Sequence, residues 1–148
     1  MSSILENKKA YFDYEILDKF EAGVELLGHE VKSVKSGRGS IIGSYIKILN
    51  DEAYILGMKI DEYQQNDALN LIDRERTRKL LLNKTELKKL KKYTDEKGLT
   101  IVPLSLYIKN RWIKASIGVG RGKKHSDKRE TIKKRDNDRA LRREHSVR

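Results

Sequence analysis

The histidines are the first residues to consider for catalysis or metal binding, because the chain contains no cysteine. His125 and His145 lie in a polar C-terminal stretch, and His29 has no second ligand at a spacing typical of metal sites. The glycines of Gly118–Gly122 do not have the spacing of a dinucleotide- or phosphate-binding loop. Catalysis requires positioned groups. We therefore expect no enzymatic activity, no metal site and no cofactor.

Glu30 is the residue with the most specific potential chemistry. It is an acid on a predicted short helix, close to Lys32 and Lys35 in a basic protein. A carboxylate on an RNA-binding face can accept hydrogen bonds from base amino groups or from a 2′-hydroxyl. The alternative is an ordinary solvated acid on the protein surface.

A second candidate is the basic run that ends in Lys79. Arg74, Arg76 and Arg78 alternate with other residues, which places them on one side of an extended segment. Such a row can follow the phosphates of RNA. It can equally be a solvated strand edge that discourages the addition of another strand.

The C-terminal 26 residues, 123–148, carry 11 basic and 5 acidic residues, so they contribute +6 to a formal net charge of +11. A basic body with a more basic tail indicates a polyanionic partner, RNA before an acidic membrane. Residues 127–136 have charges of both signs at helical separations. This pattern is marginal for an isolated helix and fits one that folds on RNA. A disordered, solubilising tail is the alternative.

These residues must be positioned by the elements of Gly23–Ile48, read as strand, helix and strand. The helix is predicted over Gly28–Gly37, since glycine commonly ends a helix in the left-handed conformation. Leu27, Val31 and Val34 fall on one side of this helix. Glu30 is expected to be held out to solvent on another side.

The strands on either side follow from alternating hydrophobicity. Tyr14–Leu26 has apolar residues at even positions, which fits one long bent strand or a tight hairpin around Asp18–Lys19. Residues 7–9, before it, are expected to be loose. A strand over 41–49 should be followed by a two-residue turn at Asn50–Asp51 and an antiparallel strand over 53–60.

The second half of the chain predicts one helix and two more strands. Asn83 followed by Glu86 has the spacing of a helix start, and Gly98 should end that helix. Strands are expected over 99–109 and 113–119, joined by a turn at 110–111. Pro103 should place the first of them at an edge or in a bulge.

Several short antiparallel strands with small helices favour a mainly β fold, an OB-type barrel. We expect the barrel to occupy residues 1–122 and a basic tail, unstructured when free, to occupy residues 123–148. No apolar run approaches the ~18 residues that span a bilayer, and Met1–Lys9 lacks the apolar core of a signal peptide. A soluble, cytoplasmic protein with no membrane partner is expected.

Several stretches of the chain match one known family in order. They are Asn7–Ala10, Phe20–Val24, Gly28–Ser33, Gly43–Tyr45, Arg76–Leu82, Lys97–Leu104, Gly122–Lys124 and Asp127–Arg129. Together they resemble the SsrA-binding proteins, also called small protein B, the bacterial partners of transfer-messenger RNA (tmRNA). The resemblance covers most of the chain, from Asn7 to roughly Asp136.

The resemblance implies an OB-type barrel that binds the tRNA-like domain of tmRNA. It also implies entry into the decoding centre of stalled ribosomes, with delivery by elongation factor Tu, for peptide tagging and ribosome rescue. A monomer is expected. The RNA-binding residues expected from the resemblance and the basic run are Glu30, Val31, Lys32, Ser33, Arg76, Arg78, Lys79, Leu99, Thr100 and Lys124. Those expected to contact the ribosome from the tail are Asp127, Lys128, Arg129, Lys133, Lys134 and Arg135.

Some positions depart from the family pattern, and two other functions are alternatives to it. His29 replaces a small residue, and Ser126 replaces Tyr or His, which calls into question any stacking contact from residue 126. A general OB-fold RNA chaperone is the main alternative, with Tyr11, Tyr63 and Trp112 as its candidate stacking aromatics. A membrane-surface protein is disfavoured because the tail has too few apolar residues for an amphipathic helix.

Overall fold

The computed structural model describes residues 3–61 and 74–123 of the 148-residue chain. Within them lie nine strands and three helices. In chain order these are β1 Ser3–Glu6, α1 Lys8–Asp13, β2 Tyr14–Val24, α2 Gly28–Lys35, β3 Gly39–Ser40, β4 Tyr45–Leu49, β5 Glu52–Leu56, β6 Lys59–Ile60, β7 Arg78–Leu81, α3 Lys84–Thr94, β8 Leu99–Lys109 and β9 Trp112–Gly122.

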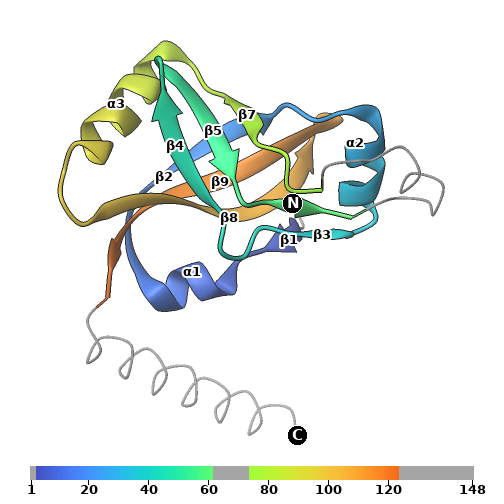
Figure 1. Ribbon diagram of the computed structural model, residues 1–148, viewed down its shortest axis with the longest axis horizontal. Helices are drawn as coiled ribbons and strands as arrows, with labels where there is room; N and C mark the ends of the chain where they lie inside the picture. Colours follow the sequence, from blue (N-terminus) through green and yellow to red (C-terminus); the bar gives the residue numbers. More distant parts are fainter. Residues whose placement is uncertain (1–2, 62–73, 124–148) are drawn as a thin grey trace, which may run out of the picture.

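Six of the strands close into a ring, as Figure 1 shows. The neighbours run β8, β4, β5, β7, β2 and β9, and β9 pairs again with β8. Every pairing is antiparallel. The short strand β1 adds to β8, and β3 and β6 form a separate two-stranded ribbon. The predicted mainly β fold with an antiparallel barrel is therefore confirmed.

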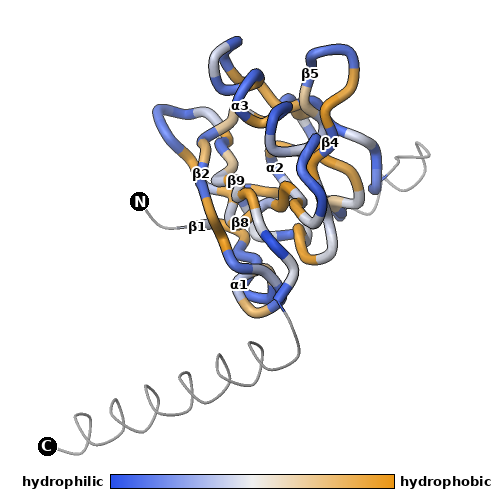
Figure 2. The backbone as a smooth tube through the Cα atoms, turned by 90° about the vertical axis from the view of Figure 1, so that its left-hand side faces the viewer, coloured by the Kyte–Doolittle hydropathy of each residue, from blue (hydrophilic) through white to orange (hydrophobic). Residues whose placement is uncertain are grey.

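The interior of the barrel is filled by one large apolar cluster. Its fully buried members come from several strands and helices, and include Val34, Ile55, Leu80, Leu90 and Ile117. Figure 2 shows hydrophobic and hydrophilic residues alternating along the strands, as expected when one face of a sheet packs on a core. The helices α2 and α3 each bury an apolar stripe against this cluster.

The segment over residues 14–24 is one long strand, which decides between the two alternatives left by the sequence. Its pairing with β9 runs from Tyr14 opposite Gly122 to Gly23 opposite Lys114. The register shifts between Ile16 and Asp18. Such an irregularity bends a strand without ending it, so β2 follows the curvature of the barrel.

Pro103 lies at an irregularity of an interior strand, and not at a sheet edge. The register between β8 and β9 shifts between Pro103 and Ser105. A bulge reverses the alternation of side chains along a strand. As a result Ile101 and Leu106 face the main core, while Leu104 belongs to a smaller cluster with Ala10.

Three of the predicted boundaries need correction. Residues 7–9 are not loose, because Lys8 and Lys9 begin α1 and Asn7 caps it. The strand expected over 41–49 begins only at Tyr45, and residues 39–40 form the separate strand β3. The strand expected over 53–60 is divided by Gly57, whose φ of 82° belongs to the left-handed region that interrupts a strand.

Both predicted two-residue turns are confirmed by their backbone conformation. Asn50 and Asp51 have φ values of 49° and 60°, and Asn110 and Arg111 have values of 51° and 71°. Two successive residues with positive φ make the turn that best fits twisted hairpin strands. In residues 3–61 and 74–123, no helix is long and apolar enough to cross a membrane.

Candidate RNA interface

The first turn of helix α2 is capped by the carboxylate of Glu30. The Glu30 carboxylate accepts a hydrogen bond from the Leu27 backbone N–H at 2.8 Å. This contact satisfies an N–H that the helix itself leaves without a partner. The helix ends before Gly37, whose φ of 73° suits the left-handed position after a helix. The predicted helix is thus confirmed.

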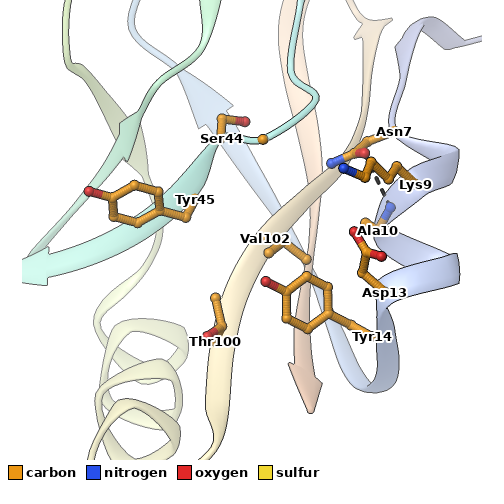
Figure 3. A pocket seen from close by; sticks show the side chains of 10 residues that line it. Asn7, Lys9, Ala10, Asp13, Tyr14, Ser44, Tyr45, Thr100 and Val102 are labelled. Atoms are coloured by element: carbon orange, nitrogen blue, oxygen red, sulfur yellow. Dashed lines mark hydrogen bonds between the residues drawn. The ribbon is translucent and has the colours of Figure 1, made fainter. Parts of the chain in front are cut away.

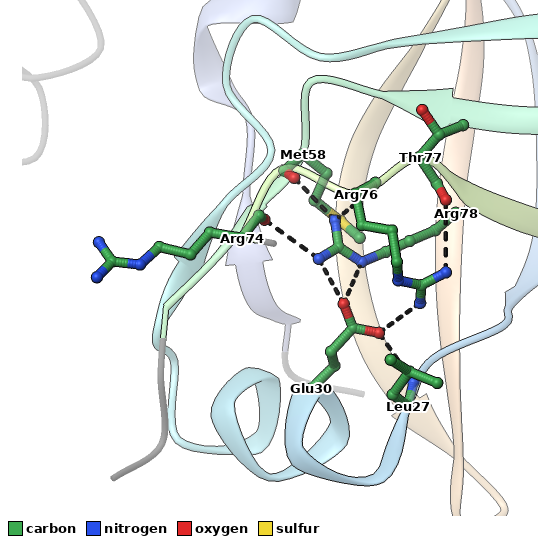
Figure 4. Close-up of polar contacts among 7 residues, drawn as sticks. All are labelled: Leu27, Glu30, Met58, Arg74, Arg76, Thr77 and Arg78. Carbon is green, nitrogen blue, oxygen red and sulfur yellow. Dashed lines mark hydrogen bonds and ion pairs between the residues drawn. The ribbon is translucent and has the colours of Figure 1, made fainter. Parts of the chain in front are cut away.

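Glu30 does not project into solvent, so that expectation is wrong. Its side chain is 2% exposed and lies under β7, as Figure 4 shows. One carboxylate oxygen, Oε1, accepts from Arg76 Nη2 at 2.5 Å. The other, Oε2, accepts from Arg78 Nε at 2.8 Å and from Arg78 Nη2 at 2.5 Å. In this arrangement both oxygens are used within the protein, and neither is presented to RNA.

Arg78 is fully buried and therefore cannot belong to a phosphate track on the surface. Beside its two bonds to Glu30, Nη1 donates to the carbonyls of Met58 and Arg76, both at 2.8 Å. Nη2 also donates to the carbonyl of Arg74 at 3.2 Å. A guanidinium has five N–H groups, and each has an acceptor here. Arg78 ties α2 to the strands around it.

The three arginines also do not share one side. Figure 4 shows the side chains of Arg76 and Arg78 directed to Glu30, whereas that of Arg74 points away. The alternation expected for an extended segment fails because β7 begins only at Arg78. Arg76 is the member of this cluster that keeps partial contact with solvent, with 35% of its side chain exposed.

The charge of Glu30 is stabilised by these contacts. Burial alone acts to raise the pKa of the carboxyl, but hydrogen bonds from Arg76, from the Leu27 N–H and from Arg78 outweigh it, so the pKa lies below its ordinary value. Glu30 therefore stays ionised at neutral pH. Two cations held by one carboxylate leave a net positive charge beside α2.

The neighbours of Glu30 on α2 divide between core and surface. Ser33 is fully buried, so it lies away from any RNA bound at the surface. Lys32 is exposed, and Val31 is half-buried against the core. Lys79, on β7, is partly exposed and pairs with Glu52 at 3.0 Å.

Leu99 and Thr100 lie at the other end of the barrel from α2. Thr100 pairs with Gly120 near the end of β9, whereas α2 follows the opposite end of β2. Thr100 lines a cavity of about 340 Å³ between α1, β4 and β8, shown in Figure 3. Tyr14, Tyr45 and Lys9 also line this cavity. The predicted RNA-binding residues therefore do not form one continuous face.

A different surface has the composition expected for RNA binding, next to α2. It is a groove of about 460 Å³ between the end of β2, the end of β7 and the turn that joins β8 to β9. We call it the Trp112 groove. Its lining residues are Gly23, Val24, Glu25, Leu26, Val31, Leu81, Arg111, Trp112, Ile113 and Lys114. Trp112 is 69% exposed, an unusual exposure for the one tryptophan of the chain.

Gly23, which has no side chain, is one of the residues that line the groove. Gly23 lies between Leu81 of β7 and Lys114 of β9 in the sheet. A Cβ at this position would come within 3.3 Å of the Leu81 Cβ. Leu81 itself is half exposed. An apolar floor with an exposed indole, Arg111 and Lys114 at its border suits an unpaired base whose phosphates meet the cations.

Beside the groove, Glu21 of β2 bonds to two side chains of β8 on the outer surface of the sheet. Its carboxylate accepts hydrogen bonds from the Tyr107 hydroxyl and, at 3.2 Å, from Lys109 Nζ. The hydrogen bond from Tyr107 and then that from Lys109 hold the pKa of Glu21 below its ordinary value. Burial and the bond to Glu21 raise the pKa of Tyr107. This contact fixes β2 to β8 across β9.

The sequence contained a signal for this groove that the site prediction did not use. Ile113, Ala115 and Ile117 alternate as core residues of β9, so Trp112 and Lys114 must face outward. A tryptophan forced outward beside a turn is a candidate contact residue. Lys124 and the predicted ribosome contacts, residues 127–129 and 133–135, lie outside the residues that the structure describes.

Comparison with known proteins matches this chain to one family along nearly its whole length. The model of the family described as SmpB protein matches residues 4–147. The chain belongs to the SmpB family. The SsrA-binding protein of Microcystis aeruginosa is 47% identical over 138 residues, covering 93% of this chain and 90% of the relative. That of Coprothermobacter proteolyticus is 45% identical over 149 residues, covering 100% and 99%.

A solved structure supports the same fold. The SmpB-family chain is similar, with a TM-score of 0.69 and 40% identity, to a chain in the structure described as "tmRNA-SmpB: a journey to the center of the bacterial ribosome". The match covers 86% of this chain and 93% of that one. The predicted family resemblance is thereby confirmed.

Proposed function

We propose that this SmpB-family chain binds tmRNA and accompanies it into stalled ribosomes, where the pair permits peptide tagging and ribosome rescue. The observation that carries the proposal is family membership over residues 4–147, with a related chain solved together with tmRNA and the ribosome. The net charge of +11 and the Trp112 groove support it, since both suit an RNA ligand. Its place of action is the cytoplasm, its role is RNA binding rather than catalysis, and it acts as a monomer.

We assign the tmRNA contact to the Trp112 groove and the α2 surface around Val31 and Lys32. In this assignment an unpaired base stacks on the indole, and Arg111 and Lys114 meet its phosphates. Glu30 and Arg78 act as positioning residues, because their mutual contacts fix α2 against β7. Arg76 is the basic residue of this cluster that can turn toward RNA.

The tail has a separate role in this proposal. Asp127, Lys128 and Arg129 would contact the decoding centre, and Lys124, Lys133, Lys134 and Arg135 would contact RNA phosphates. Delivery by elongation factor Tu acts through the tmRNA complex. The family resemblance of Gly122–Lys124 and Asp127–Arg129 supports this part.

The deciding experiment measures which RNA the protein selects and whether the groove is used. Purified protein should bind a tmRNA transcript more tightly than a structured control RNA of equal length. Trp112→Ala should weaken tmRNA binding by about 1–3 kcal/mol, the usual contribution of one stacked base. Tyr45→Ala, which removes another exposed aromatic far from the groove, is the matched control. Equal binding of both RNAs would favour the general RNA chaperone.

A further inference from the structure

Glu25 is the single acidic residue among the described residues that line the Trp112 groove. Its side chain is exposed. Within the part of the chain that the structure describes, its carboxylate has no hydrogen bond and no ion pair. Its charge acts on Lys79, but the ammonium group of that lysine is bound to Glu52 at 3.0 Å. The carboxylate is therefore available to a ligand in the groove.

The backbone holds Glu25 at the border of the groove. Val24, the last residue of β2, is buried, so strand alternation turns the next side chain outward. The Glu25 N–H donates to the Lys79 carbonyl of β7 at 2.9 Å. The register of β2 with β9, continued for two residues beyond its last pair, brings Glu25 opposite Trp112. Opposite residues of antiparallel strands share one side, so the carboxylate and the indole border the same space.

A carboxylate in this place is unfavourable for binding phosphates. Its negative charge repels an RNA backbone, which the protein otherwise attracts through its net charge of +11 and, in the groove, through Arg111 and Lys114. An ionised carboxylate can only accept hydrogen bonds. Glu25 therefore favours an RNA ligand only where a base presents hydrogen-bond donors to it.

Guanine is the base whose edge fits a carboxylate best. Its N1–H and its N2 amino group are adjacent donors on the Watson–Crick edge, and they match the two oxygens of one carboxylate. Adenine and cytosine offer one amino group beside a ring nitrogen that accepts, and uracil offers one N–H between two carbonyls. A carboxylate that faces any of these three bases places an oxygen against another acceptor.

We infer that Glu25 selects guanine in the Trp112 groove. An unpaired guanine stacks on the indole, its N1–H and N2–H groups donate to the Glu25 carboxylate, and Arg111 and Lys114 meet the neighbouring phosphates. The inference rests on the proposed function, which assigns this groove to tmRNA, and adds the identity of the base. Stacking on Trp112 is open to every base, so the selection comes from Glu25.

The test uses the fluorescence of Trp112, which is the one tryptophan of the chain and lines the groove. A base that stacks on the indole should quench this fluorescence. The probes are RNA pentamers of uridine with a central guanosine, inosine or adenosine. Inosine is guanosine without the N2 amino group, so it lacks one of the two donors. Each pentamer is titrated against the unmodified protein, Glu25→Gln and Glu15→Gln, which removes an equal charge elsewhere on β2.

The unmodified protein and Glu15→Gln should bind the guanosine pentamer roughly tenfold more tightly than the adenosine pentamer, with the inosine pentamer between them. In Glu25→Gln the three pentamers should bind within about twofold of one another, because the amide presents a donor to one of the guanine donors. Binding of the adenosine pentamer should not weaken in this variant, which shows that the groove is intact.

Three results would overturn the inference: equal binding of guanosine and adenosine by the unmodified protein, an unchanged preference in Glu25→Gln, or no quenching by any pentamer. Failure of the unmodified protein to prefer a tmRNA transcript to the control RNA would instead contradict the proposed function.

Discussion

At the scale of single residues, the Glu30–Arg76–Arg78 cluster has the largest energetic consequences. Arg78 is fully buried, and within residues 3–61 and 74–123 Glu30 is the one ionised group that bonds to it. Removing one partner of a buried ion pair leaves the other charge buried without compensation. The cluster therefore stabilises the fold only as long as every member is present.

We predict that Glu30→Gln lowers the free energy of unfolding by about 3–5 kcal/mol, the usual cost of breaking a buried ion pair from one side. Glu15→Gln, on the exposed side of β2, is the matched control and should change it by about 0.5 kcal/mol or less. Urea denaturation followed by circular dichroism measures both. A Glu30→Gln protein as stable as the control would show that Arg78 is solvated in solution.

The same carboxylate predicts a dependence of stability on pH. The pKa of Glu30 is lower in the folded state than its ordinary value of 4.5. The stabilisation is therefore complete above about 4.5 and is lost as the pH falls through the lowered value. When the free energy of unfolding is measured at decreasing pH, it should decrease less steeply below pH 4.5 in Glu30→Gln than in the unmodified protein. Parallel curves would assign the acid sensitivity to other carboxylates.

The burial of Glu30 was not predictable from the sequence, whereas the place of Trp112 was. Glu30 is separated by 46 and 48 residues from its two arginine partners. Its own neighbourhood, with Lys32 and Lys35, indicates a surface residue. Outward placement of Trp112 follows from the alternation of its immediate neighbours alone. Local patterns thus determine which face a residue occupies, but not which distant residue covers it.

At the scale of elements, α1 is attached to the barrel chiefly through Asn7. The Asn7 side chain accepts from the Ala10 N–H at 3.2 Å and donates to the Pro103 carbonyl at 2.9 Å. The backbone N–H of Asn7 also donates to the Leu104 carbonyl at 2.9 Å. One residue therefore caps a helix and binds the irregular part of β8.

We predict that Asn7→Ala destabilises the protein by about 2 kcal/mol, because it removes a cap and leaves a buried carbonyl with fewer partners. The N-cap of α3 is the comparison: Asn83→Ala, at an exposed cap, should cost about 1 kcal/mol. Thermal unfolding of the two variants shows which substitution destabilises the protein more. A smaller loss for Asn7→Ala than for Asn83→Ala would contradict the anchoring role.

The strands and helices were largely predictable because their signals are local. Alternation marked β2, β8 and β9, and capping residues marked α3. The short helix α1 was missed because Asn7, which caps it through the Ala10 N–H, is held in place by contacts with Pro103 and Leu104, which are distant in the sequence. Its six residues are too few for helix propensity to be informative.

At the scale of the whole molecule, the barrel closes within the described residues, 3–61 and 74–123. The last strand, β9, ends at Gly122, and Lys123 still donates its backbone N–H to the Asp13 carbonyl at 2.9 Å. The core contains residues from Leu5 to Val119. We therefore expect the domain boundary at residue 122 or 123, as the change in composition predicted.

We predict that a chain truncated after Lys123 unfolds within a few degrees of the full-length protein, because charged, polar segments contribute little burial. It should keep tmRNA binding within roughly tenfold, since a loss of net positive charge weakens binding to phosphates. It should fail to support tagging in a reconstituted translation system. The full-length protein with Asp127, Lys128 and Arg129 changed to Ala tests the same point without a change in length. Normal tagging by both would reduce the tail to a solubilising segment.

The pairing of β2 with β9 determines when this protein can fold during its own synthesis. Tyr14 lies opposite Gly122, so β2 cannot complete its pairing until β9 has been synthesised. At about 5–20 residues per second, roughly 5–20 s pass between their syntheses. During that interval β2 has no partner for the side that β9 will cover. A messenger cut before the codons of β9 therefore yields a chain whose barrel cannot close, because β9 pairs with both β2 and β8.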